Sequence, residues 1–180
     1  FWRSEWREIL RQRAIRLMNT GVDGLFLDDA LNYFVAGSLK GRAPGMPSDV
    51  PEAAEIMLSL VQEIAIEART VRCNALIIVN NGVFVGRDAG PENLAAFATY
   101  RAAIDGIMIE DGFGGADTPV LHTALQEDYL AKGIPVLSLD FTSKAHTEDM
   151  VKRARGKGYA PYIVPDGSFS SLGPPVAEAP

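Results

Sequence analysis

The sequence predicts an α/β fold with a parallel sheet, and three observations lead to this class. Five short apolar runs alternate with segments whose apolar residues recur every three to four positions, the pattern of strands separated by amphipathic helices. The run from Leu25 to Leu27 is apolar without interruption, which is typical of a strand covered on both faces. In the later part of the chain the strand–helix unit recurs about every 30 residues, as consecutive right-handed units of a parallel sheet do.

Chain length decides which kind of parallel sheet is expected. A closed eight-stranded β/α barrel takes about 250 residues and at least about 200, whereas this chain has 180. The chain is therefore either an open, doubly wound sheet or the C-terminal part of a barrel. It contains neither a Gly-x-Gly-x-x-Gly turn after a strand nor a Gly-x-x-x-x-Gly-Lys-[Ser/Thr] loop, which removes the usual nucleotide-binding argument for the open sheet.

The first half of the chain is expected to contain two amphipathic helices and two strands. Gly21 and Gly24 interrupt the pattern of the first helix and end it. Pro51 suits the first turn of the second helix, which then keeps a 3.6-residue period. A Gly- and Pro-rich segment between them is longer than a plain connection, which is typical of a binding face. We expect, in order, a helix over 2–18, a strand over 24–28, a loop over 37–51, a helix over 51–68 and a strand over 75–80.

The second half repeats the strand–helix unit. Its first strand follows the order already seen at 23–29, namely Asp-Gly, three apolar residues and two acids. Thr147 suits the N-cap of a last helix. The β/α part is expected to cover residues 1–166, and the small, polar and Pro-rich remainder, 167–180, is expected to be a tail. We expect helices over 91–101, 118–132 and 147–157, and strands over 105–110, 135–140 and 159–164.

Composition narrows the class of ligand. The formal net charge of −6 argues against nucleic acid, whose phosphates need a basic face, and suits a neutral or cationic ligand. No apolar run reaches 18 residues, so we expect no membrane span. The single cysteine, Cys73, stands just before an apolar run and is expected to be a small core residue.

Acidic and amide side chains stand at the ends of four of the expected strands. In a barrel these ends converge on one mouth, where the chemistry takes place. Glycoside hydrolysis requires two carboxyl groups, a protonated acid for the leaving oxygen and an anion that attacks the anomeric carbon or activates water. Repulsion between like charges raises the pKa of one member of such a pair, so that both forms coexist. The residues concerned are Asp28, Asp29, Asn80, Asn81, Glu110, Asp111 and Asp140.

The same oxygen atoms could instead hold Mg²⁺ or Ca²⁺. No tight Asp-x-Asp-x-Asp loop occurs, so we expect no metal and no cofactor. His122 and His146 fall on or just before helices, which predicts solvated surface side chains rather than a catalytic triad or a zinc site. Tyr33, just past the first strand, is expected to face the ligand, because an aromatic ring there could stack on a sugar.

Five motifs resemble, in order, strands four to eight of the family 114 glycoside hydrolases. They are Gly-Val-Asp-Gly-Leu-Phe-Leu-Asp, Leu-Ile-Ile-Val-Asn-Asn-Gly, Ile-Asp-Gly-Ile-Met-Ile-Glu-Asp, Pro-Val-Leu-Ser-Leu-Asp-Phe and Gly-Tyr-Ala-Pro-Tyr-Ile. The family consists of (β/α)8 TIM-barrel proteins and includes endo-α-1,4-polygalactosaminidases and extracellular glycosidases of bacteria and archaea. The resemblance covers residues 2–166. It implies that this chain holds strands four to eight of the barrel.

The resemblance also implies roles for individual residues. Asp28 and Glu110 match the two family acids. By analogy with other retaining α-glycosidase barrels, Asp28 would be the nucleophile, held by hydrogen bonds from neighbours such as Asn81, and Glu110 the general acid/base. Leu31 stands where the family often carries a second acid. The residues expected to bind substrate are Asp29, Tyr33, Asn80, Asn81, Asp111 and Asp140.

The implied activity is cleavage of an α-1,4-linked galactosamine polysaccharide, with an extracellular or periplasmic location. An acidic mouth would favour a cationic amino-sugar polymer. Two other functions stay open, a carbohydrate-binding barrel without turnover and a Mg²⁺-dependent lyase or aldolase on the same scaffold. If part of the barrel wall is absent, a strand edge and helix faces that are apolar should be exposed.

Overall fold

A computed structural model describes residues 1–39, 43–115, 117–141 and 146–164. The chain divides into two compact units, Phe1–Asp105 and Gly106–Pro180, and each is described by itself. The expected tail, 167–180, lies outside the described residues. Helices and strands alternate in both units, and the strand pairs within each unit are parallel, so the α/β class is confirmed.

All five expected strands are present, with ends that differ from the expected ones by at most one residue. Unit 1 contains α1 (Ser4–Met18), β1 (Gly24–Leu27), α2 (Asn32–Ser38), α3 (Val50–Val71), β2 (Leu76–Asn80), α4 (Val85–Asp88), η1 (Pro91–Asn93) and α5 (Leu94–Ala103). Unit 2 contains β3 (Gly106–Glu110), α6 (Pro119–Ala124), η2 (Leu125–Tyr129), η3 (Leu130–Lys132), β4 (Val136–Phe141), α7 (Thr147–Gly156) and β5 (Ala160–Val164).

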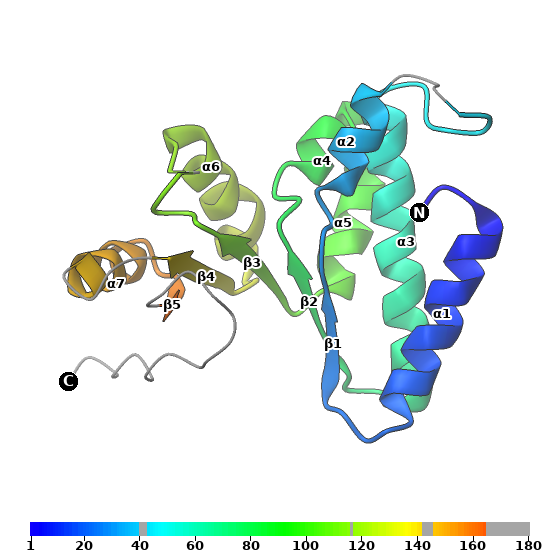
Figure 1. The fold of residues 1–180 in the computed structure, drawn as a ribbon, viewed down its shortest axis with the longest axis horizontal. Helices are drawn as coiled ribbons and strands as arrows, with labels where there is room; N and C mark the ends of the chain where they lie inside the picture. The colour runs from blue at the N-terminus through cyan, green and yellow to red at the C-terminus, as the bar shows by residue number, and fades with distance from the viewer. Residues whose placement is uncertain (40–42, 116, 142–145, 165–180) are drawn as a thin grey trace. The chain divides into compact units, whose positions relative to one another are not determined.

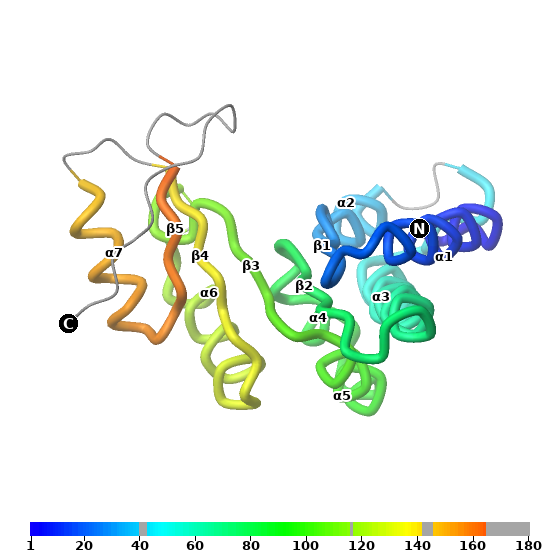
Figure 2. Tube along the Cα trace, turned by 90° about the horizontal axis from the view of Figure 1, so that it is seen from below, coloured from blue at the N-terminus to red at the C-terminus, as the bar shows by residue number. Residues whose placement is uncertain are grey.

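The long helix α3 organises unit 1. It begins with Asp49, whose side chain accepts a hydrogen bond from the amide of Glu52 at 3.0 Å, and Pro51 occupies its first turn as expected. α1 and α3 lie side by side (Figures 1 and 2). Arg7 ties them together, because its guanidinium donates to both carboxylate oxygens of Glu63, at 2.6 and 3.2 Å. Such a fork-to-fork pair fixes orientation as well as adding energy.

The two strands of unit 1 pair in parallel, with Phe26 opposite Ile78 and Leu27 opposite Val79. Side chains of a strand alternate between the two faces of the sheet. Leu25, Ile77 and Val79 are buried and form the face that the helices cover. Phe26 lies on the other face and is 51% exposed. Asp28, two residues further on, continues this open face.

An apolar edge is exposed beside β1, as expected for part of a barrel wall. Within the described residues of unit 1, β1 pairs with β2 alone. Large apolar side chains of this region are exposed, among them Phe26 and, on α1, Trp6 at 49%. A free strand edge with apolar flanks is the arrangement that a further strand would cover.

Unit 2 consists of β3, β4 and β5, paired in parallel in that order, with α6 and α7 as connections. Glu110 lies opposite Leu139, and Asp140 opposite Ile163. The expected helix over 118–132 is present but changes its winding, from α through one π turn to a short 3-10 turn that ends at Gly133. Gly133 has φ 79°, the left-handed conformation that commonly ends a helix.

Three local expectations were incomplete or wrong. The short helices α2 and α4 were not expected, since their Gly content and length give no helical period. Gly37 is required in α2 because an added Cβ would lie 2.5 Å from the Cα of Val50, so α2 packs closely on the start of α3. Cys73 is exposed rather than buried, because the strand begins only at Leu76.

In the part of the chain that the structure describes, no helix combines the length and apolarity needed to cross a bilayer.

Candidate active site

The same turn ends three successive strands. The backbone is left-handed at Asn81 (φ 59°) and Asp111 (φ 55°), directly after β2 and β3. It is also left-handed at Asp29 (φ 58°), the second residue after β1. Left-handed backbone is uncommon for residues other than Gly, and Asp and Asn tolerate it best. The residue just before each turn is the polar residue that the sequence singled out, Asp28, Asn80 or Glu110. Uncommon backbone at the carboxyl ends of strands points to function.

Asp28 is exposed, and one of its oxygens is held in place. Oδ1 accepts the backbone amide of Asp29 at 2.8 Å and the Nδ2 of Asn80 at 2.7 Å. Within the described residues the second oxygen, Oδ2, has no hydrogen-bond partner. The expectation that neighbouring donors hold Asp28 is therefore met, but the amide donor is Asn80 rather than Asn81. Asn80 ends β2 and is buried, so its donor is fixed by packing.

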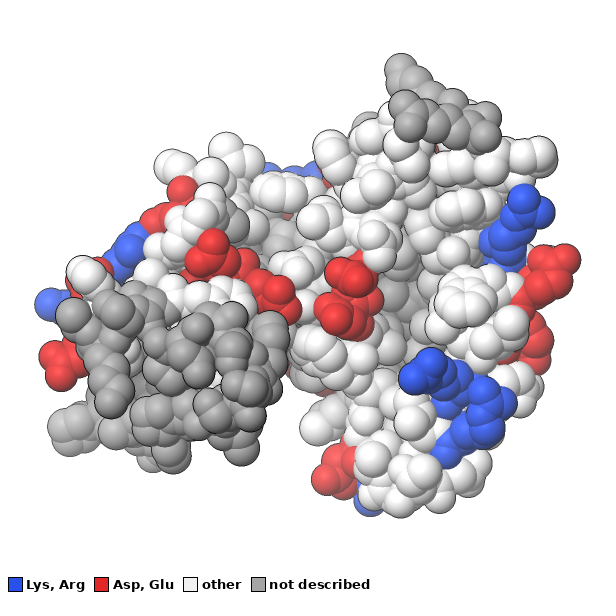
Figure 3. Space-filling model, viewed as in Figure 1, with Lys and Arg blue, Asp and Glu red and all other residues white. Residues whose placement is uncertain are grey.

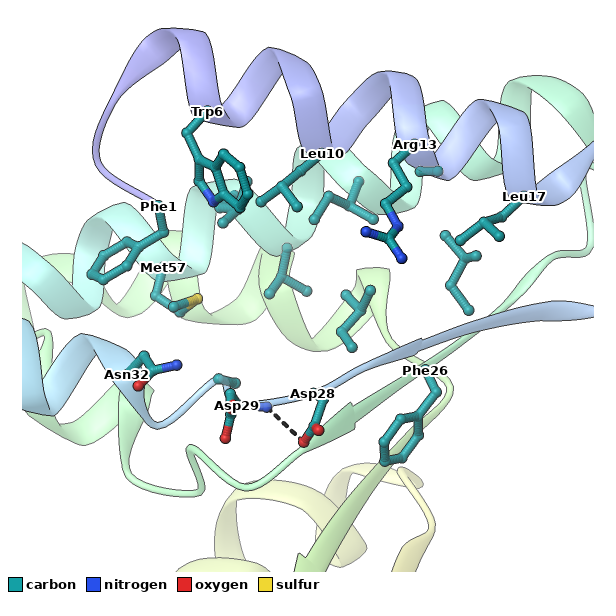
Figure 4. A pocket seen from close by; sticks show the side chains of 17 residues that line it. Phe1, Trp6, Leu10, Arg13, Leu17, Phe26, Asp28, Asp29, Asn32 and Met57 are labelled. Atoms are coloured by element: carbon teal, nitrogen blue, oxygen red, sulfur yellow. Dashed lines mark hydrogen bonds between the residues drawn. The ribbon is translucent and has the colours of Figure 1, made fainter.

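An open groove of about 510 Å³ runs between α1, α3 and β1, and Asp28 lies on its β1 side, between Asp29 and Phe26 (Figure 4). Its wall is mostly apolar and includes Leu10 and Leu17 of α1. Figure 4 shows the side chains of Phe26 and Asp28 pointing from β1 to the same side, away from α1. Acidic side chains gather at the carboxyl end of β1, and basic ones lie over α1 (Figure 3). Asp28 and Asp29 thus give this strand end a negative charge.

Tyr33 lies inside unit 1 rather than on its surface. It is 0% exposed, and its hydroxyl donates to Oδ2 of Asp88 at 2.6 Å. Burial, the hydrogen bond and the charge of Asp88 raise the pKa of Tyr33 far above that of an ordinary tyrosine. The bond links α2 to α4, and so joins the segments that follow β1 and β2.

We expect Tyr33→Phe to lower the free energy of unfolding at pH 7 by about 1.5–3 kcal/mol, the usual range for a hydrogen bond to a charged group. The loss should shrink above pH 10. There the tyrosine ionises in the unfolded chain but keeps its proton in the folded one, so the wild type loses stability that the variant cannot lose. Urea unfolding of both proteins between pH 7 and 11 measures this. A constant difference over that range would contradict the raised pKa of Tyr33.

The turn after β3 is held by the neighbouring strand β4. The amide of Asp111 donates to the carbonyl of Leu139 at 2.8 Å. The amide of Phe113 donates to Oδ1 of Asp140 at 2.7 Å, and Ser138 donates its hydroxyl to Oδ2 of the same carboxylate. Glu110 and Asp111 are half-buried, whereas Asp140 is 0% exposed. Both carboxylate oxygens of Asp140 are thus hydrogen-bonded to residues of unit 2.

His122 is buried, so the expectation of a solvated side chain was wrong. Its ring stacks on Phe113 with centroids 4.9 Å apart, and Nε2 lies 3.0 Å from Oδ1 of Asp117. Nδ1 lies 3.1 Å from the hydroxyl of Tyr159. The ionised carboxylate of Asp117 can only accept, so Nε2 donates to it, and in the neutral ring Nδ1 then accepts from the hydroxyl of Tyr159. Burial raises the pKa of Tyr159 to about 12. His122 is one of the three buried residues of α6, with Leu121 and Ala124.

Arg153 of α7 completes this cluster. Arg153 pairs with Asp117, and its guanidinium carbon lies 5.1 Å from the centre of the Phe113 ring. Burial would raise the pKa of Asp117, but the hydrogen bond from His122 and the charge of Arg153 outweigh it and lower that pKa. The carboxylate therefore stays ionised, and the loop after β3 is fastened to α6 and α7.

Within unit 1 the structure brings together Asp28, Asp29 and Asn80, with Asn81 in the adjoining turn. Within unit 2 it places Glu110 and Asp111 in one turn, and Asp140 accepts a hydrogen bond from the amide of Phe113 in the same turn. Sequence reasoning missed the partners Asp88 and Ser138, since neither stands in a repeated motif. Among the described residues, no group of three or more His, Cys, Asp or Glu side chains is arranged to hold a metal ion.

Comparison with known proteins places the fold in one class. The chain superposes on the glycoside hydrolase domain of PelA from Pseudomonas aeruginosa with a TM-score of 0.61 and 17% identity, over 91% of this chain and 61% of that one. A variant of the same domain gives a TM-score of 0.56 at 16% identity, with the same coverage. The chain therefore has the fold of part of a glycoside hydrolase domain.

Two sequence relatives of this chain are uncharacterized proteins, so they carry no functional information. An uncharacterized protein of Deinococcus radiodurans is 25% identical over 171 residues, and one of Thermotoga maritima is 26% identical over 180. These matches cover 91% and 90% of this chain, but 49% and 50% of the relatives. The chain thus spans about half the length of the curated relatives that it matches. No family model matches the chain.

Proposed function

We propose that this protein is a retaining glycoside hydrolase in which Asp28 is the nucleophile and Glu110 the general acid/base. One observation carries the proposal: a carboxylate precedes the same left-handed turn at the ends of both β1 and β3. The fold of a glycoside hydrolase domain supports it, because carboxyl ends of barrel strands are where such enzymes place their acids.

In the proposed reaction Oδ2 of Asp28 attacks the anomeric carbon. As the bond between that carbon and the leaving oxygen breaks, Glu110 gives its proton to that oxygen. Glu110, now a carboxylate, then takes a proton from water, whose oxygen attacks the same carbon and releases Asp28. Two inversions restore the original anomeric configuration.

The surroundings of Asp28 suit a nucleophile. Both donors, the amide of Asp29 and the side chain of Asn80, bind Oδ1. These two hydrogen bonds fix the orientation of the carboxyl group, and placing both on one oxygen leaves Oδ2 available. The exposed open face of β1, which also carries Phe26, gives a sugar access to that oxygen.

The role of Asn80 can be tested separately. We expect Asn80→Ala to lower kcat by about 10–100-fold, because Asp28 loses one of its two donors and its fixed rotamer. Asn93→Ala is a matched control, since it removes a comparable 2.8 Å bond, from the side-chain amide of Asn93 on η1 to the carbonyl of Ala89, and kcat should stay unchanged. Steady-state kinetics of both variants decide this. An Asn80→Ala enzyme with full kcat would contradict the assignment.

The substrate we propose is an α-1,4-linked galactosamine polymer, with free amino groups favoured. Asp28 and Asp29 make the end of β1 negative, and further acids, Glu110 and Asp111, end β3. A negative site raises the local concentration of a cationic chain, an effect that salt weakens. Asp29, Asn81 and Asp111 are proposed to contact the sugar. The proposal includes secretion to the extracellular space or periplasm, where such polymers lie.

Digestion of partially deacetylated α-1,4-polygalactosamine by the full-length protein tests this function. Chain shortening is expected, with rates that fall as acetylation or salt rises. Release of no fragments from any acetylation level would contradict hydrolysis. Tight binding without cleavage would instead favour a carbohydrate-binding barrel.

We also propose that further chain completes the barrel at the free edge of β1. The apolar groove there and the exposed Trp6 of α1 are what a neighbouring strand and helix would cover. This chain covers 61% of the matched glycoside hydrolase domain, so that domain has further chain outside the matched part.

A further inference from the structure

Asp140 belongs to β4, yet its polar contacts all serve the turn after β3 and its own strand. Oδ1 accepts the amide of Phe113 at 2.7 Å, and Oδ2 accepts the hydroxyl of Ser138. Phe113 is only three residues beyond Glu110, the proposed acid/base, and all atoms of Asp140 are screened from solvent. A buried carboxylate is costly unless it is hydrogen-bonded, so these two donors account for its position.

The register places Asp140 and Glu110 on opposite faces of the unit 2 strands. Glu110 lies opposite Leu139, and directly paired residues of neighbouring strands share a face. Asp140, the next residue, therefore belongs to the other face. Along β4 the residues on that face, Val136, Ser138 and Asp140, are buried, while those between them are half-buried. A sugar held against Glu110 would meet the face of Leu139 rather than that of Asp140.

We propose that Asp140 is a positioning residue for Glu110, and that its carboxylate acts by holding the turn Glu110–Phe113 rather than by contacting substrate. This inference rests on the proposed function of Glu110 as the acid/base.

Three contacts hold the turn Glu110–Phe113 in one conformation. The amide of Asp111 is bound to Leu139, the amide of Phe113 to Asp140, and the Phe113 ring is stacked on His122. Asp111 has φ 55°, an uncommon conformation that persists only when its surroundings determine it. Without Asp140 the Phe113 amide would be buried without its acceptor, and the turn that aims Glu110 would relax.

The test compares Asp140→Ala, which removes the acceptor, with Asp140→Asn, whose amide oxygen can still accept from Phe113 while its NH2 donates to Ser138. On the full-length protein we expect Asp140→Ala to lower kcat about 100-fold with KM unchanged, the cost of a misplaced catalytic group. Asp140→Asn should restore kcat to within about tenfold of the wild type, because it keeps the bond.

A matched control separates positioning from loss of stability. Asp105 also accepts a backbone amide, that of Ile77 at 2.8 Å, at the other end of the strands. Asp105→Ala should destabilise the protein and leave kcat unchanged. Raised KM with normal kcat in Asp140→Ala would overturn the inference, because it would indicate that Asp140 contacts the substrate. Equal losses of kcat in Asp140→Ala and Asp105→Ala would also overturn it, because they would indicate a loss of stability alone.

Amide hydrogen exchange gives a readout that does not need activity. Residues 111–115 should lose protection in Asp140→Ala and keep it in Asp140→Asn, and unchanged protection in Asp140→Ala would overturn the inference. If the wild type cleaves and Glu110→Gln does not, the proposed function stands whatever Asp140 does. If the wild type cleaves nothing, the proposed function fails, and Asp140 then has no acid/base to position even where exchange shows that it holds the turn.

Discussion

Replacing Asp28 by Gly is expected to lower kcat/KM on the natural polymer by about 10⁴-fold or more, the range seen when a nucleophile is removed. The variant loses the atom that attacks the anomeric carbon and leaves a small space beside Asn80. Azide should enter that space and form a glycosyl azide of inverted configuration from a substrate with an activated leaving group. Kinetics with and without azide, and the configuration of the product, measure this.

The control for Asp28 is Asp23→Asn, which removes a carboxylate before β1 rather than after it. Asp23 is exposed and pairs with Arg72 at 2.6 Å, so the variant should keep its activity. If azide restores nothing while water-dependent cleavage persists, Asp28 is not the nucleophile. The proposal would then give way to an inverting reaction or a different acid.

Replacing Glu110 by Gln is expected to lower kcat/KM on the natural polymer by about 10²–10⁴-fold, the contribution of a general acid/base. The same variant should form the glycosyl-enzyme almost normally from an aryl glycoside with a good leaving group, because that oxygen needs no proton. Release of water-derived product should then be slow. A burst of released phenol followed by a slow steady state is the expected signal.

Glu148→Gln is the matched control, since Glu148 is an exposed glutamate in the first turn of α7. Its kinetics should equal those of the wild type. Equal losses of Glu110→Gln on good and poor leaving groups would contradict an acid/base role, because only the poor leaving group depends on protonation.

The strands could be predicted from sequence because each is a short apolar run that ends in polar residues. Residues 24–28, 105–110 and 159–164 were expected as strands, and the structure has them to within one residue. Parallel pairing followed from the helices between them. The repeated order of Asp-Gly, apolar residues and two acids also indicated that β1 and β3 end alike, which the left-handed turns confirm.

The direction of individual side chains could not be predicted so well. Tyr33 and Asp140 stand at strand ends in the sequence, but both are buried, and their contacts with Asp88 and with Phe113 arise from tertiary packing. A shift of one position along a strand moves a side chain to the other face. This is why Asn80 rather than Asn81 reaches Asp28. His122 shows the same limit on a helix, where the packed face depends on neighbours distant in sequence.

The anomeric configuration of the first product tests the central claim most directly. Full-length protein is mixed with α-1,4-polygalactosamine, and proton NMR follows the new reducing end during the first minutes, before mutarotation. A retaining reaction through Asp28 and Glu110 predicts that the α-anomer appears first and the β-anomer only later. Initial release of the β-anomer would contradict it.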